Sequence, residues 1–176
     1  SELSPILTGL FHIQNIVYLT RTNYTNNDEI KKALMEYGAV ATSIYWSGSY
    51  LTDKNYYYSG STSANHAITI VGWDDNYSRD NFKNKPAGNG AWIIKNSWGT
   101  KGGDGGFYYV SYYDTKCAQI NKPLSTYTFV LNDTLKLDKN YQYDIPGWTD
   151  FFINSSSKVW YKNRFVATDD EYLAAV

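Results

Sequence analysis

Two runs of sequence organise this chain: residues 65–73, NHAITIVGW, and residues 91–99, AWIIKNSWG. Both are rich in β-branched and aromatic residues, which is the composition expected of strands. The polar stretch between them, residues 74–89, carries charges of both signs and predicts a long surface loop. The two runs therefore predict neighbouring antiparallel strands, with a histidine heading the first and an asparagine following the second.

His66 and Asn96 are the candidate functional residues of this strand pair. Facing residues on paired strands have Cβ atoms about 5 Å apart, so the two side chains can meet. We expect the Asn96 amide oxygen to accept a hydrogen bond from Nδ1–H of His66, which leaves Nε2 to take a proton from a nucleophile. Trp98 is placed to cover this hydrogen bond. On spacing alone, a structural role for both residues is the favoured interpretation, and only the surrounding pattern reverses it.

The sequence before residue 65 alternates between strand and helix patterns. Residues 10–19 predict a strand, and residues 29–37 predict a helix that follows polar residues at 26–29 and ends at Gly38. Residues 39–46 predict a buried strand. Residues 47–65 predict a loop whose tyrosines more often pack than face a substrate.

The sequence after residue 99 predicts more strands. A glycine-rich turn at 99–106 leads into a strand at 107–112, and its glycines do not match a phosphate-binding loop. The character changes near residue 114. Strand patterns at 126–131, 140–143 and 158–166 predict a second, all-β unit with sandwich-like architecture. We therefore predict an α+β fold for residues 1–114 and a partial all-β domain for residues 115–176.

Composition limits the classes of function. The 176 residues are 43% hydrophobic and 18% aromatic, enough for a packed core. The net charge of −1 gives no electrostatic case for a nucleic-acid partner, and no apolar run is long enough to span a membrane. The single cysteine, Cys117, excludes an intrachain disulfide and a cysteine-based zinc site. We expect no metal and no cofactor.

Both ends of the sequence predict that the chain is part of a longer protein. Ser1 is not an initiator methionine, and no signal peptide follows it. Residues 169–176 resemble a helix start with acidic residues in its first turn, and the chain stops there.

In these same runs the sequence resembles the papain-like cysteine protease family. The match is carried by residues 65–73, by residues 92–99 and by Gly106-Phe107-Tyr108, within a resemblance that covers residues 10–112. It implies that the family's catalytic histidine corresponds to His66, its orienting asparagine to Asn96, and the aromatic residue that shields their contact to Trp98. The first 114 residues are then expected to form the β-rich C-terminal lobe, an antiparallel sheet or barrel with one or two helices.

Two departures from the family pattern matter. The family's second tryptophan is replaced by Gly102, which predicts a more open cleft on that side. The nucleophilic cysteine and the upstream glutamine of the oxyanion hole are absent. Cys117 follows the strand after Asn96 and opens no helix, so a bystander role is favoured for it. Because the family's histidine and asparagine follow the cysteine by about 130–150 residues, the nucleophile is expected roughly 65–85 residues before Ser1.

The tail resembles a lectin-like β domain that follows papain-like domains in some bacterial and archaeal surface proteases. The resemblance rests on residues 141–144, 160–165 and 171–176, and an ordinary β-sandwich remains an alternative. It implies an extracellular or cell-surface location. The implied partners are a peptide or protein substrate and, through the C-terminal domain, a cell-surface glycan.

Three functions remain open at this stage. The first is a cysteine-type endopeptidase, of which this chain carries the histidine and asparagine without the nucleophile. The alternative is a protease-derived peptide-binding, glycan-binding or adhesion protein that does not cut, although such a protein needs neither His66 nor Asn96. A third is a carbohydrate-binding module, suggested by 18 tyrosines and the tail.

Overall fold

The computed structural model describes residues 12–132 and the single positions 164, 166 and 170. Within residues 12–132 one helix accompanies eight strands. In chain order the elements are β1 (His12–Tyr18), α1 (Asp28–Tyr37), β2 (Val40–Ile44), β3 (Leu51–Thr52), β4 (Asn55–Tyr56), β5 (His66–Asp74), β6 (Ala91–Lys95), β7 (Phe107–Ser111) and β8 (Thr126–Asn132). Short 3-10 turns occupy Gly48–Tyr50 and Arg79–Asn81.

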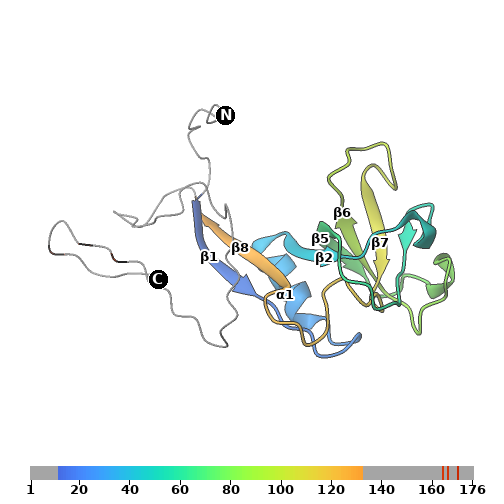
Figure 1. Cartoon of the computed structure of the whole chain (residues 1–176), viewed down its shortest axis with the longest axis horizontal. Helices are drawn as coiled ribbons and strands as arrows, with labels where there is room; N and C mark the ends of the chain where they lie inside the picture. Colours follow the sequence, from blue (N-terminus) through green and yellow to red (C-terminus); the bar gives the residue numbers. More distant parts are fainter. Residues whose placement is uncertain (1–11, 133–163, 165, 167–169, 171–176) are drawn as a thin grey trace, which may run out of the picture. The chain divides into compact units, whose positions relative to one another are not determined.

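The eight strands form one sheet in the order β1-β8-β2-β5-β6-β7-β4-β3. Every neighbouring pair is antiparallel except β4 and β7, which are parallel. Figure 1 shows β1, β8 and α1 gathered at one end, and β6 and β7 with their loops at the other. The mixture of one helix with an antiparallel sheet confirms the predicted α+β class.

The central strands bury one face of the sheet. Along β2, Val40, Thr42 and Ile44 are buried, whereas Ala41 and Ser43 are half-buried. The predicted buried strand therefore buries one face and half-buries the other, because apolar and small residues alternate along it. The largest fully buried hydrophobic side chains of the core are Trp92, Tyr56, Ile30, Ile44, Ile70, Ile94, Val40 and Val110.

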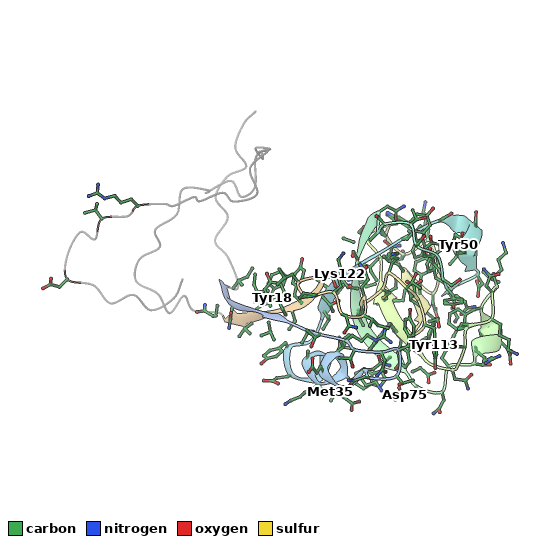
Figure 2. The ribbon with its side chains drawn as sticks, turned by 60° about the horizontal axis from the view of Figure 1, so that its bottom comes forward. Tyr18, Met35, Tyr50, Asp75, Tyr113 and Lys122 are labelled. Atoms are coloured by element: carbon green, nitrogen blue, oxygen red, sulfur yellow. The ribbon has the colours of Figure 1, made fainter. Side chains whose placement is uncertain are left out.

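Helix α1 packs one face against the sheet near β2, β5 and β8. Ile30, Ala33 and Leu34 are buried, while Met35 is 79% exposed and points outward (Figure 2). The helix begins one residue before the predicted start.

The segment before α1 lacks the expected side-chain cap. The Asn27 side chain caps no helix N–H. Its Oδ1 instead accepts a hydrogen bond from Nε of the buried Arg21, at 2.8 Å. Arg21 also donates through Nη2 to the carbonyl oxygens of Tyr24 and Tyr112, at 2.9 and 2.8 Å. A buried guanidinium must be hydrogen-bonded, and this requirement takes the asparagine away from its capping role.

Strand β8 extends the sheet beyond residue 114. The sequence pattern predicts residues 126–131 in the second unit, but β8 pairs with β1 and β2, and the first compact unit runs to Asp133. The strand pattern was read correctly, and its pairing could not be inferred from local sequence. The strands predicted at 140–143 and 158–166 lie outside the described residues apart from Arg164 and Val166. The partial lectin-like domain stays a prediction.

The segment 47–65 contains two short strands that we did not predict. Tyr56, in β4, is fully buried and its backbone pairs in parallel with β7 at Val110. Tyr58 is also buried. Both rings therefore pack into the core, which is the interpretation that the sequence favoured.

A buried carboxyl group closes the turn after β7. Asp114 is 1% exposed, and it accepts backbone hydrogen bonds from Tyr58, Lys116 and Cys117 at 2.8–2.9 Å. Burial raises the pKa of the Asp114 carboxyl to about 6, against the opposing effect of these three N–H donors and of Arg21.

This shift predicts a pH dependence of stability. The folded state holds the Asp114 proton up to about pH 6, whereas the unfolded chain releases it near pH 4. The contribution of this group to the free energy of unfolding therefore falls as pH rises from about 4 to 6, by up to about 3 kcal/mol. Urea unfolding at pH 4, 5, 6 and 7 should show this fall in the native chain relative to Asp114→Asn. A difference between the two chains that stays constant or grows with pH would contradict the prediction.

Candidate active site

A one-residue bulge in β5 places His66 and Asn96 on the same face of the sheet. On the C-terminal side of the bulge in β5, Gly72 pairs with Ile93. On its N-terminal side, Ile70 pairs with Ile94, so Val71 is the extra residue. Thr69 pairs with Lys95. Continuing this register sets Asn96 opposite residue 68, which has the same side-chain direction as His66. Without the extra residue, the register would turn His66 to the opposite face.

His66 and Asn96 are joined by a hydrogen bond of 2.9 Å between Nε2 and Oδ1. The Ser97 backbone N–H donates to the same Oδ1 at 2.8 Å, which identifies this atom as the amide oxygen. The imidazole must therefore donate through Nε2–H, and Nδ1 is left as the basic nitrogen.

This arrangement reverses the expected roles of the two ring nitrogens. The prediction that Nδ1 donates to Asn96 and that Nε2 stays free is therefore wrong. The two residues are not directly opposite but diagonal, a separation of about 7–8 Å between backbones. Nε2 is the ring nitrogen farther from Cβ, so it spans this larger gap.

Trp98 covers the imidazole as expected. Its ring is stacked on His66 with centroids 4.7 Å apart and planes 21° from parallel. The indole is 56% exposed, while Asn96 beneath it is 6% exposed. The hydrogen bond between His66 and Asn96 is therefore nearly buried on the asparagine side, with an exposed indole stacked on its imidazole.

The glycine turn after Asn96 fixes the position of that residue. The Asn96 backbone N–H donates to the carbonyl oxygen of Gly106 at 3.1 Å. Gly106 in turn donates to the carbonyl of Gly102 at 2.8 Å. A Cβ atom added at Gly102 would lie 2.3 Å from the Tyr108 hydroxyl, so Tyr108 fills the space that a side chain there would need.

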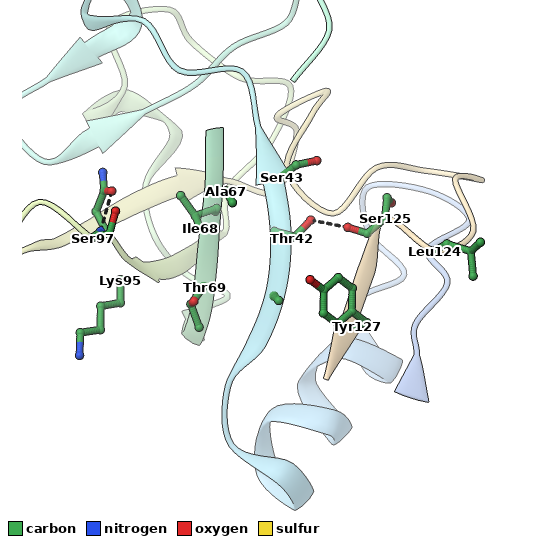
Figure 3. A pocket seen from close by; sticks show the side chains of 12 residues that line it. Thr42, Ser43, Ala67, Ile68, Thr69, Lys95, Ser97, Leu124, Ser125 and Tyr127 are labelled. Carbon is green, nitrogen blue, oxygen red and sulfur yellow. Dashed lines mark hydrogen bonds between the residues drawn. The ribbon is translucent and has the colours of Figure 1, made fainter. Parts of the chain in front are cut away.

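An open groove of about 640 Å³ runs beside this site. Figure 3 shows its walls on β6, β5 and β2 and on the segment that enters β8, where the Thr42 hydroxyl donates to the Ser125 carbonyl at 3.2 Å. The lining is mostly small or polar: Ala41, Thr42, Ser43, Ala67, Ile68, Thr69, Lys95, Asn96, Ser97, Leu124, Ser125 and Tyr127. Ala67 and Asn96 place the groove directly next to His66.

Cys117 donates its backbone N–H to the Asp114 carboxylate. It is fully buried, and burial raises the pKa of its thiol well above the usual value. A neutral, inaccessible thiol is a poor nucleophile. Within residues 12–132, no group of three or more His, Cys, Asp and Glu side chains could hold a metal ion. No helix in the described part is long and apolar enough to cross a membrane.

Comparison with known proteins identifies the family. The sequence profile of the papain family of cysteine proteases matches residues 9–128. The chain belongs to this family. The probable cysteine protease RD19C of Arabidopsis thaliana is 33% identical to it over 89 residues, which are 49% of this chain and 23% of the relative. The chain spans about a quarter of the length of such curated relatives.

Solved structures support the same fold. The cysteine protease and lectin-like domains of Cwp84, a surface layer associated protein of Clostridium difficile, match with a TM-score of 0.62 and 32% identity over 72% of this chain and 28% of that one. Cwp84 after propeptide cleavage matches with a TM-score of 0.61 and 33% identity over 69% and 30% of the two chains. The predicted papain-like β-rich lobe is therefore confirmed.

The structure brings His66, Asn96 and Trp98 into contact, together with an aromatic cluster that the sequence pattern did not predict. Trp46 follows β2, and its ring lies 5.3 Å from Trp98 and 6.1 Å from His66, centroid to centroid. Only the pairing of Ile44 with His66 brings this residue to the site. The pattern of residues 39–46 alone gave no such signal.

Two adjacent glycines allow a matched test of the turn. Gly106 has φ +94°, and an added Cβ would lie 2.5 Å from the Gly99 carbonyl oxygen. Gly105 has φ +62° with nothing within 4 Å. Gly105→Ala should cost about 1 kcal/mol of unfolding free energy from backbone strain alone. We expect Gly106→Ala to lower the free energy of unfolding, measured with urea, by clearly more than Gly105→Ala does. It should also displace the backbone N–H of Asn96 from the Gly106 carbonyl. Equal costs for the two substitutions would show that the close contact with Gly99 does not matter.

Proposed function

We propose that this chain is the histidine- and asparagine-bearing part of a cysteine-type endopeptidase. The observation that carries the proposal is the Nε2–Oδ1 hydrogen bond between His66 and Asn96, with Trp98 stacked over it. His66 would act first as the base and then as the acid. Asn96 would orient the imidazole, and Trp98 would keep water from their contact.

The free Nδ1 of His66 determines how the chemistry would proceed. A cysteine thiol supplied from outside the described residues would give its proton to Nδ1, and the Asn96 oxygen would stabilise the imidazolium through Nε2–H. The thiolate would attack the peptide carbonyl and form a thioester, while Nδ1 returns the proton to the departing amine. Water activated at Nδ1 would then hydrolyse the thioester.

Family membership implies a peptide substrate, and the groove beside His66 is where we place it. Its floor of small residues, including Ala41, Ser43 and Ala67, would admit an extended chain. We also propose an extracellular or cell-surface location, since Cwp84 is described as surface layer associated. We further propose that the residues after 133 bind glycan, by analogy with the lectin-like domain that the same Cwp84 structure includes.

The test is thiol-dependent hydrolysis of a fluorogenic dipeptide by the full reading frame that contains this chain. His66→Ala should reduce kcat/KM by about 10³-fold or more, because base and acid are lost together. Asn96→Ala should reduce it by about 10²-fold, because the imidazole remains but is no longer oriented. His12, the other histidine, provides the control: His12→Ala should leave kcat/KM unchanged. Full activity in His66→Ala would refute the proposed role of this residue.

The 176-residue chain by itself should be inactive. Base and orienter without a nucleophile give little rate enhancement, and Cys117 is buried. In the same fluorogenic assay, we expect this chain to show no thiol-dependent hydrolysis, so that adding a thiol alkylator changes nothing. Alkylator-sensitive turnover by this chain would mean that Cys117 becomes accessible and acts as the nucleophile.

A non-catalytic descendant of such proteases is the second candidate. Its groove would bind peptide or glycan without cutting, and the nucleophile position would carry Ser, Gly or Ala. The retained hydrogen bond between His66 and Asn96 favours the enzyme, because binding alone does not require a basic, oriented imidazole. The sequence of about 100 residues preceding Ser1 separates the two candidates.

A further inference from the structure

Trp46 is the residue at which the aromatic rings near the site converge. Its indole is stacked face to face on Tyr56, with centroids 4.6 Å apart and planes within 6° of parallel. Its other contacts are edge-on: Trp98 at 5.3 Å and 83°, Tyr108 at 5.1 Å and 81°, and His66 at 6.1 Å and 66°. Trp46 therefore touches both the imidazole and the indole that covers it.

The ring beneath Trp46 is rigidly held. Tyr56 is fully buried, and its hydroxyl donates to the Tyr45 carbonyl oxygen. The Ser47 backbone N–H donates to the same hydroxyl at 3.3 Å. Trp46 thus rests on a side chain that is fixed at both its ring and its oxygen.

The backbone of Trp46 is tied to the residue before His66. The Trp46 N–H donates to Oδ1 of Asn65 at 2.7 Å, and Nδ2 of Asn65 donates to the Trp46 carbonyl at 3.1 Å. The β2–β5 ladder ends where Ile44 pairs with His66, so the Asn65 carboxamide continues it by one more step. Two hydrogen bonds of the Asn65 side chain, one to the N–H and one to the carbonyl of Trp46, therefore fix the position of Trp46 relative to His66.

Trp98, by contrast, has few contacts that would hold it over His66. It lies beyond the end of β6, in the turn before Gly99, and more than half of its surface is exposed. Among the described residues, its ring contacts are with His66 and Trp46. An exposed indole with one stacked neighbour would exchange rotamers unless its edge were also blocked.

We infer that Trp46 is a positioning residue that holds Trp98 stacked on the His66 imidazole. The importance of this role for catalysis rests on the proposed function, whereas the contact between Trp46 and Trp98 is independent of it. Tyr56 supports Trp46, Trp46 blocks the edge of Trp98, and Trp98 covers the Nε2–H bond to Asn96. The role explains how Trp98 stays in place although Gly102 supplies no second indole beside it.

The experiment is side-chain NMR of the histidines in the 176-residue chain. The chain has two histidines, so His12 reports any general change while His66 reports the site. We compare Trp46→Ala, Trp46→Leu and Trp46→Phe with Trp73→Ala. Trp73 is a matched control because it is also a partly buried indole packed against the core, on the same strand as His66, and none of its ring contacts is with His66.

Loss of the ring should release Trp98 from His66. In Trp46→Ala and Trp46→Leu, the ring-current shift on the His66 carbons should shrink, and its Nε2–H should exchange with water roughly 2- to 10-fold faster, the factor expected for loss of one aromatic pair. Trp46→Phe should restore most of both signals, whereas Trp73→Ala should change neither.

Several results would overturn the inference. Unchanged His66 signals in a folded Trp46→Leu chain would remove the positioning role. Equal changes at His12 and His66 would indicate a general loss of structure instead. If neither Trp46→Ala nor Trp46→Leu folds, the test rests on Trp46→Phe and the unaltered chain. The absence of nuclear Overhauser contacts between the side chains of residues 46 and 98 in both chains would then refute the positioning role. None of these readouts requires a nucleophile, so they separate this inference from failure of the proposed peptidase activity.

Discussion

The extra residue in β5 determines whether this sheet can hold a functional pair at all. Side chains alternate between faces every residue, so a shift of one in the pairing between β5 and β6 would carry His66 away from Asn96. The register is secured by Ile70 and Ile94, which face each other at the bulge and are both fully buried. A slip would expose both and bury polar groups in their place. The core therefore enforces the geometry of the imidazole several residues away.

Local patterns predicted the elements well and their partners poorly. The strands around His66 and before Asn96 lie close to their expected bounds because β-branched and aromatic residues dominate them. In contrast, β4 is two residues long and is defined by its pairing with β3 on one side and β7 on the other. Strand β8 had a clear sequence pattern, but it pairs with β2, which lies more than eighty residues earlier in the chain. Short or distant pairings leave no periodic signal in sequence.

The site shows the same division between chemistry and geometry. The residue types His66, Asn96 and Trp98 and their neighbouring glycines carry enough information to be recognised together. Which ring nitrogen faces the amide depends on whether the residues are opposite or diagonal, and that depends on the bulge at Val71. The contact with Trp46 likewise depends on the pairing of β2 with β5. The sequence therefore predicted which side chains come together, while the tertiary register determines how they meet.

The pairing of β1 with β8 has a consequence for how the chain is made. Tyr18, at the end of β1, pairs with Tyr127, and His12 with Asn132. At about 5–20 residues per second, a ribosome needs roughly 5 to 25 s to deliver β8 after β1 has emerged. During that interval the apolar side chains of Ile13 and Ile16 belong to a strand without its neighbour. Among the strands of residues 12–132, β1 is thus synthesised first and paired last, and until then its unpaired edge is open to chaperones that bind exposed strands.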